Sequence, residues 1–111
     1  MAVKKYNEMK VDQIREGRER RLGYTENLMM VIIDFSDGPQ TKPDPPHAHP
    51  HEQVSYVAEG EILFFLEEDC ERLGPGDMFV VPPDKPHSIQ LLTDHVRLVD
   101  CFHPIRRDFL T

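Results

Sequence analysis

The residues of this sequence that could do chemistry begin with His47 and His49, which stand two positions apart. Residues with this spacing on a β-strand project from the same face, so both imidazoles could bind one metal ion. Pro50 follows directly, and we expect the strand to end there because proline has no N–H to donate to a sheet ladder. Gln53 opens a second β-rich run, which Gly60 ends at a turn. A third ligand on that neighbouring strand would make a rigid site, although a lone His-x-His pair also occurs by chance on surface loops.

The elements that must position these residues are short strands separated by turns. Segment 11–23 has the charge content of a helix, but Gly17 in its middle and the missing apolar stripe favour two short strands. Residues 36–46, rich in Asp, Gly and Pro, form the longest predicted loop and lead to His47. An acidic turn is expected over 67–69, and 72–73 should lead into the next turn at 74–77. The other predicted strands are 26–35, 53–58, 61–66, 78–81, 87–92 and 96–102.

Composition favours one small all-β domain over residues 1–111, with 1–10 as a loose N-terminal arm. The chain is long enough for one core, and its ten prolines and six glycines predict many turns. Short strands at this spacing are typical of a β-sandwich or a closed barrel. Several strands are apolar on both faces (28–33, 62–66 and 79–81), so we predict a homodimer that covers the exposed face. The alternative is that the N-terminal segment folds over that face.

Charge and cysteine content exclude several classes of partner and compartment. A net charge of −7 argues against nucleic acid or an anionic membrane as a partner. The apolar runs are too short to span a membrane, and no apolar segment follows the N-terminus as in a signal peptide. Cys70 and Cys101 lack the spacing of a metal site or an evident disulfide, so we expect free thiols and a cytoplasmic protein.

Two segments resemble the paired motifs of the cupin superfamily, G-x5-H-x-H-x3,4-E-x6-G and G-x5-P-x-G-x2-H-x3-N. In the first motif His47, His49 and Gly60 match, Gln53 stands in the glutamate place, and Thr41 stands where a glycine leads the motif. In the second motif Gly76, Pro82 and His87 match. Asp84 stands where glycine is usual, and Leu91 stands where asparagine is usual.

The resemblance implies a jelly-roll barrel (a double-stranded β-helix) that holds a divalent metal on His47, His49, Gln53 and His87. Imidazole donors suit a transition metal, which we expect to be Ni, Zn, Fe, Mn or Co. Since no ligand in this set is anionic, the ion would keep its double charge for water or an anionic substrate, which favours a Lewis-acid role. Gln53 is the weakest ligand of the set, because an amide oxygen is a poorer donor than a carboxylate.

The remaining histidines and Glu52 are expected outside the metal site. His51 lies in the turn before Gln53 and should face solvent, while His95 and His103 belong to neither motif. Glu52 could in principle replace Gln53 as a ligand, but its turn position should point it away from the site.

The last predicted strand carries an acid among apolar residues. By alternation Asp100 and Phe102 share a face with Val96 and Leu98. If this face points inward, Asp100, Phe102 and Arg106 line the mouth of the barrel near the metal, and a buried carboxylate is costly unless it has a function. The alternative is that Asp100 lies at a frayed, wet strand end.

The run Asp100-Cys101-Phe102-His103-Pro104-Ile105-Arg106, with HxHPHEQ before it, resembles the small cupins of pectin and alginate breakdown. Those enzymes linearise 4,5-unsaturated uronate monosaccharides to 5-keto-4-deoxyuronates. The resemblance implies that Asp100 moves protons, Phe102 packs against the sugar ring, and Arg106 pairs with the uronate carboxylate, a task that Arg107 could share. A small anionic carbohydrate is therefore the expected substrate. The open alternatives are a cupin dioxygenase or isomerase using Fe, Ni or Mn, and a binding module without catalysis.

Overall fold

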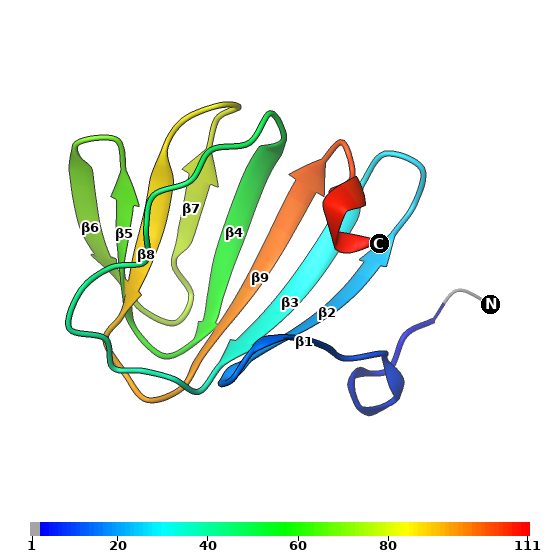
Figure 1. Cartoon of the computed structure of the whole chain (residues 1–111), viewed down its shortest axis with the longest axis horizontal. Helices are drawn as coiled ribbons and strands as arrows, with labels where there is room; N and C mark the ends of the chain where they lie inside the picture. Colours follow the sequence, from blue (N-terminus) through cyan, green and yellow to red (C-terminus); the bar gives the residue numbers. More distant parts are fainter. Residues whose placement is uncertain (1–2) are drawn as a thin grey trace.

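A computed structural model describes residues 3–111, and nine strands run through that part of the chain (Figure 1). Two 3-10 helices, η1 (Tyr6–Glu8) and η2 (Arg107–Phe109), flank them. No helix among the described residues is long and apolar enough to cross a membrane. The strands are β1 (Asp12–Arg15), β2 (Arg18–Tyr24), β3 (Met29–Phe35), β4 (Glu52–Glu59), β5 (Ile62–Leu66), β6 (Asp69–Leu73), β7 (Met78–Val81), β8 (His87–Leu91) and β9 (Val96–His103).

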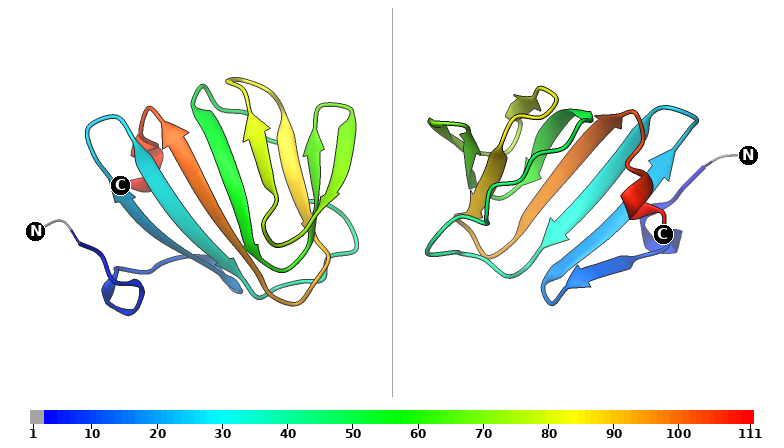
Figure 2. Two further views of the ribbon diagram at one scale, coloured as in Figure 1. Left: turned by 180° about the vertical axis from the view of Figure 1, so that it is seen from behind. Right: turned by 45° about the horizontal axis from the view of Figure 1, so that its top comes forward.

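These strands form two antiparallel sheets. The larger sheet has the order β1-β2-β3-β9-β4-β7, and the smaller has the order β6-β5-β8. The two sheets face each other (Figure 2). The predicted all-β jelly-roll fold is confirmed, and so are the two short strands around Gly17.

The core lies between the sheets and follows the alternation of the strands. On β9 every second residue is buried, from Val96 to Phe102, and β4 buries Gln53, Ser55 and Val57 in the same way. Across the gap Phe64 of β5 stacks on Phe79 of β7, with ring centroids 4.2 Å apart. Because a strand turns successive side chains to opposite faces, this alternation decides which side chains reach the interior.

Two predictions about local structure were wrong. The segment that starts at Asp69 is a strand, β6, which pairs with β5 even though most of its side chains are polar and exposed. Its burial pattern fits an edge strand, where neither hydrophobic content nor alternation is strong. His47 and His49 do not share a strand, because prolines on both sides remove N–H donors from the ladder. His47 instead forms an isolated bridge with His87, through N–H···O distances of 3.0 and 2.9 Å.

The loop over 36–46 runs along the free edge of β8 and delivers His47 to the site. The backbone N–H groups of Gln40 and Asp44 donate to the carbonyls of Leu91 and Ile89, at 2.9 and 3.0 Å. Arg18 of β2, in the large sheet, binds two aspartates of the same loop. Its guanidinium donates to both carboxylate oxygens of Asp44, at 2.7 and 3.2 Å, and its Nε donates to Asp37.

The N-terminal segment covers one end of the outer face of the large sheet. Residues 1 and 2, where the predicted loose arm begins, lie outside the described residues. Tyr6 donates to Asp34 at 2.6 Å, and its ring lies under the guanidinium of Arg21, 3.9 Å from the centroid. Arg97 also donates to Asp34, at 2.7 Å. From Tyr6 onward the arm is therefore tied to the outer face.

Replacing Arg18 by methionine should destabilise the protein by about 3 kcal/mol, because two carboxylates would lose their partner next to a buried position. Arg18 is 8% exposed. Arg15 contacts the same two carboxylates at 3.4 and 3.6 Å, but its side chain is 54% exposed, so Arg15→Met should cost less than about 1 kcal/mol. Urea unfolding of both variants measures the difference. Equal losses of unfolding free energy in Arg18→Met and Arg15→Met would contradict this role of Arg18.

Candidate metal centre and active site

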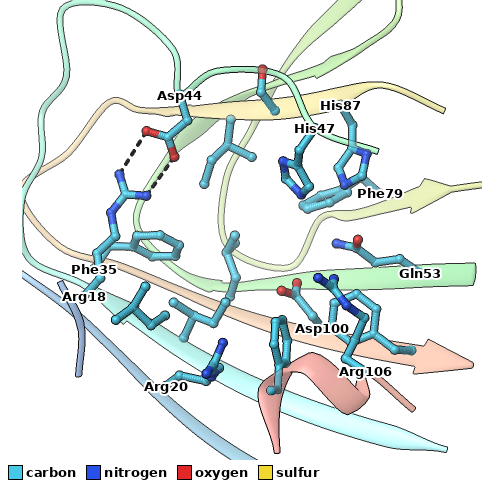
Figure 3. Close-up of a pocket in the computed structure, with 17 residues that line it drawn as sticks. Arg18, Arg20, Phe35, Asp44, His47, Gln53, Phe79, His87, Asp100 and Arg106 are labelled. Atoms are coloured by element: carbon cyan, nitrogen blue, oxygen red, sulfur yellow. Dashed lines mark hydrogen bonds and ion pairs between the residues drawn. The ribbon is translucent and has the colours of Figure 1, made fainter. Parts of the chain in front are cut away.

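Three histidines from two segments of the chain converge, His47 and His49 from the segment before β4 and His87 from β8. The candidate ligand nitrogens of His47, His49 and His87 all lie within 4.8 Å of one another. His49 and His87 are buried, whereas His47 is exposed at the rim. Figure 3 shows the rings of His47 and His87 side by side above Gln53. The sequence prediction placed these histidines together, and the bridge between His47 and His87 is the local structure that brings them there.

The hydrogen bonds of His87 leave one ring nitrogen free to bind a metal. Its Nδ1 lies 2.8 Å from the carbonyl oxygen of Lys85, and a carbonyl can only accept, so Nδ1 carries the proton. Nε2 then presents a lone pair, and it is buried with no hydrogen-bond partner among the described residues. Metal-binding histidines typically donate their other N–H to a backbone carbonyl in this way.

His49 also has one ring nitrogen available to a metal, and this nitrogen faces Gln53. The Nδ1 of His49 lies 3.1 Å from the carbonyl oxygen of His51 and donates to it, which leaves Nε2 as a lone pair. That Nε2 lies 3.0 Å from Oε1 of Gln53. Two acceptors facing each other repel unless a cation lies between or beside them. The donor set therefore fits a divalent ion that takes Nε2 of His49 and Oε1 of Gln53 together.

The orientation of Gln53 is set by a chain of polar groups that ends at Asp100. Nε2 of Gln53 donates to Oγ of Ser55 at 2.9 Å, and Ser55 donates to Oδ1 of Asp100 at 2.5 Å. Because the amide nitrogen is engaged by Ser55, the amide oxygen faces His49. Ser55 was missed in the sequence analysis. Its place two residues after Gln53 on β4 is the signal that could have found it.

The protein environment favours the neutral form of the His47 and His87 rings by lowering their pKa values. Partial burial of the ring, followed by the nearby His87 and His49, lowers the pKa of His47 to about 4, although the residue as a whole is exposed. Burial also lowers the pKa of His87, and the hydrogen bond to Lys85 opposes this shift. A metal needs the unprotonated ring, so both shifts favour binding near neutral pH.

Asp100 lies on the inward face of β9, so the alternative of a wet strand end is excluded. It is 6% exposed, and its carboxyl lines the cavity below Gln53 (Figure 3). Burial raises the pKa of Asp100 to about 6, against the opposing effects of the Ser55 hydrogen bond and of the Arg106 charge. A carboxyl with a pKa near neutrality can give and take a proton in turn, which is what general acid–base catalysis requires.

Phe102 and Arg106 flank Asp100 in the same cavity. Phe102 is buried, with its ring 5.7 Å from that of His49 and nearly perpendicular to it. The guanidinium of Arg106 stacks over Phe102 and is held by Asp108 through bonds of 3.1 and 2.9 Å. Arg107 is exposed and does not line the cavity, so Arg106 is the arginine at the site. The cavity has a volume of about 300 Å³, near the lower end for small-molecule sites.

Glu52 and the three histidines outside the cluster were predicted to lie away from the metal site. Glu52 points away from the site, with its carboxylate 3.6 Å from the ring of His103. His95 and His103 are surface residues as predicted. His51 was expected to face solvent, but it is half-buried with its ring against Phe102, because the chain turns inward after Pro50.

The two unusual motif positions have structural roles. Asp84 adopts a left-handed φ of 64°, a conformation in which glycine is common and aspartate is tolerated. Its N–H donates to the carbonyl of His49 at 2.8 Å, so the turn before β8 supports the histidine segment. Leu91 is fully buried in the core. At Gly60, with φ of 79°, a Cβ would lie 2.2 Å from the carbonyl oxygen of His95, which explains the glycine.

The sequence and the fold together identify the family. The family model described as Cupin domain matches residues 35–102, more than half of the chain. The protein therefore belongs to the cupin family, as the two motifs predicted. The three-histidine group and this membership together indicate a site for a divalent metal.

Three relatives have similarities that extend over almost the whole chain. The pectin degradation protein KdgF of Dickeya dadantii (strain 3937) is 31% identical over 101 residues, which are 89% of each chain. The structure of KdgF from Halomonas sp. is 32% identical, with a TM-score of 0.84, and 94% of this chain covers 95% of that one. An RmlC-like cupin from Shewanella frigidimarina NCIMB 400 is 36% identical, with a TM-score of 0.85, and 96% of this chain covers 93% of that one.

Protein purified without added metal should contain about one transition-metal ion per chain, and His87→Ala should lose most of it. The physical reason is that Nε2 of His87 is a buried lone pair with no hydrogen-bond partner among residues 3–111. Elemental analysis provides the measurement. His103→Ala is the matched control, because His103 is exposed and outside the cluster. Equal metal content in wild type and His87→Ala would contradict the assignment.

Proposed function

We propose that this protein linearises 4,5-unsaturated uronate monosaccharides to 5-keto-4-deoxyuronates. The observation that carries the proposal is the convergence of two sets of side chains on one cavity. A metal-type donor set and an acid, an aromatic ring and an arginine all line it: His47, Gln53, His87, Asp100, Phe102 and Arg106. The similarity to two proteins named KdgF, one of them a pectin degradation protein, supports the same substrate class.

The proposed reaction is an isomerisation that needs one proton removed and one proton added. The C1 hydroxyl gives up its proton as the bond between C1 and the ring oxygen breaks. C4 then gains a proton as the 4,5-double bond becomes the C5 ketone. The raised pKa of Asp100, about 6, suits a carboxyl that takes the first proton and delivers the second. Ser55 holds the carboxyl in place through its hydrogen bond.

The other groups bind and orient the substrate. A bound divalent ion would supply Lewis-acid polarisation of a substrate oxygen. Phe102 offers an apolar face for the sugar ring, next to the stacked guanidinium of Arg106. Asp108 engages Nε and Nη2 of Arg106, and the remaining N–H groups of this cavity-lining arginine would serve a substrate carboxylate. These cations lie within a protein of net charge −7, so the attraction for an anion is local to the cavity.

Metal-loaded protein should abolish the ultraviolet absorbance of the 4,5-double bond of unsaturated galacturonate. Asp100→Asn should lower kcat at least about 100-fold, because it removes the proton carrier while preserving shape. Arg106→Ala should lower kcat/KM at least about tenfold, through the loss of charge-assisted bonds to the carboxylate. The absorbance decay measures all three.

Arg107→Ala is the control, since this exposed neighbour of Arg106 does not line the cavity. Full activity in both Asp100→Asn and Arg106→Ala would refute the proposed roles. Oxygen uptake by iron-loaded protein would favour a dioxygenase instead. A rise in Tm with galacturonate, without turnover of the unsaturated sugar, would favour a binding module.

We also propose that the protein is a homodimer formed through an outer apolar patch on the large sheet. Five side chains of this patch are between 44% and 66% exposed: Met30, Val54, Tyr56, Met78 and Val80. They lie on neighbouring strands, since Val54 pairs with Val80, and both Val54 and Met30 pair with Cys101. Tyr6 of the N-terminal segment contacts the adjacent part of this face at Asp34, and the five patch side chains stay exposed in residues 3–111. An uncharged patch suits a second copy, because two chains of net charge −7 otherwise repel.

Light scattering should give a particle of twice the chain mass for wild type and a monomer for Tyr56→Lys. A lysine at this position would place two like charges in the apolar interface. Glu68→Lys, in the turn between β5 and β6 on the other sheet, should stay dimeric. A monomeric wild type would rule the dimer out.

The proposed compartment is the cytoplasm. Cys70 and Cys101 are both free thiols, and free thiols suit a reducing compartment. The acidic surface supports the further proposal that neither nucleic acid nor an anionic membrane is a partner.

A further inference from the structure

Besides Arg106, two arginines line the cavity, and the proposed reaction uses the charge of neither. On β2 the inward-facing side chains are those of Arg18, Arg20 and Leu22, since they pair with the inward residues of β3. Arg18 and Arg20 both line the cavity with Arg106. Figure 3 shows Arg20 at the lower wall, on the same side as Asp100.

The three arginines differ in how their N–H groups are satisfied. Arg18 uses its Nε, Nη1 and Nη2 in bonds to Asp37 and Asp44. Arg106 uses Nε and Nη2 on Asp108. Arg20 makes no side-chain hydrogen bond within residues 3–111, and its Nε is buried without an acceptor. The nearest carboxylate oxygen, on Asp12, lies 3.6 Å from that Nε.

Such an arrangement is costly for the free protein. A buried donor without a partner loses its hydration, and the loss is larger for a charged group. The side chain of Arg20 is 18% exposed, so water reaches only part of it. The cost is offset when a ligand in the cavity supplies an acceptor oxygen.

Packing holds the guanidinium of Arg20 in one place. Its central carbon lies 4.0 Å from the centroid of Phe109, and that of Arg106 lies 4.3 Å from the same centroid. Phe109 in turn packs edge-on against Phe102, at 5.9 Å. Stacking engages the flat face of a guanidinium and leaves its edge for hydrogen bonds. Arg20 and Arg106 are therefore two pre-oriented donors on one wall.

We propose that Arg20 is a substrate-binding residue that donates to an oxygen of the bound sugar acid, alongside Arg106. The inference rests on the proposed function and assigns it a second cationic contact. A substrate that engages both arginines needs acceptor oxygens at separate positions. This requirement selects a polyhydroxylated acid over a short monocarboxylic acid.

The test compares Arg20→Met, which keeps much of the packing on Phe109, with Arg20→Lys, which keeps the charge. In metal-loaded protein, Arg20→Met should raise KM for unsaturated galacturonate at least about tenfold and change kcat less than about threefold, as expected for lost uniform binding. Arg20→Lys should recover part of the loss. Arg107→Met, an exposed arginine, should match wild type. Arg20→Gln serves as the neutral variant if Arg20→Met does not fold.

A second measurement separates this inference from the proposed reaction. Saturated D-galacturonate has no 4,5-double bond and cannot be converted to a 5-keto product, so its binding to metal-loaded protein is measured by calorimetry. Weaker binding to Arg20→Met than to wild type supports Arg20, even if the unsaturated sugar is not turned over. Turnover by wild type with an unchanged KM in Arg20→Met overturns the role of Arg20 and leaves the reaction standing. A wild type that neither turns over the sugar nor binds galacturonate overturns both.

Discussion

The site depends on the pair of backbone hydrogen bonds between His47 and His87. His47 precedes β4 in the chain and His87 follows β7, so neither segment alone would bring the two rings together. The bridge extends the small sheet by one residue at its free edge. Loop 36–46 follows the same edge, with Gln40 and Asp44 donating to β8. Because Arg18 anchors Asp44 from the large sheet, the two sheets hold the histidine segment between them.

A second constraint links the metal-type donors to the acid. Gln53, Ser55 and Asp100 form one chain of hydrogen bonds across β4 and β9, whose register sets Ser55 directly opposite Asp100. The amide of Gln53 cannot turn without breaking this chain. A change in the charge of Asp100 would therefore alter the hydrogen bonding of Gln53 and, through Gln53, the surroundings of His49. Two functions that look separate in sequence share one polar network.

The overall charge of this protein and the charge of its cavity wall have opposite signs. The chain as a whole is acidic, whereas the cavity wall presents Arg20 and Arg106, and the neutral rings of His47 and His87 stand opposite. Phe109 organises the cationic wall by stacking with both arginines. The ring of Phe109, which also packs against the cluster of Phe102 and Ile105, ties the short helix η2 to the site. A small anion that enters meets fixed donors, with little reorganisation needed.

The sequence by itself determined the fold class and most of the strands, and it selected the three histidines that cluster in the structure. Strand alternation was enough to place Asp100 and Phe102 on one face of their strand, because the period of a β-strand does not depend on distant contacts. That this face points inward was shown by the structure. Motif spacing was enough to choose His47, His49 and His87 from six histidines. The edge strand β6 was missed, since an exposed polar strand has no strong local signal.

Only the tertiary structure decided how these residues meet. The proline-rich segment forms a bridge to β8 in place of a strand, because its missing N–H groups leave few ladder bonds to make. Ser55 became a link between Gln53 and Asp100 through the pairing of β4 with β9. The pairing of β2 with β3 brought Arg20 to the cavity wall. Arg106 lines the cavity and stacks on Phe109, whereas Arg107 is exposed. Each of these outcomes depends on contacts between segments far apart in the chain, which local pattern does not encode.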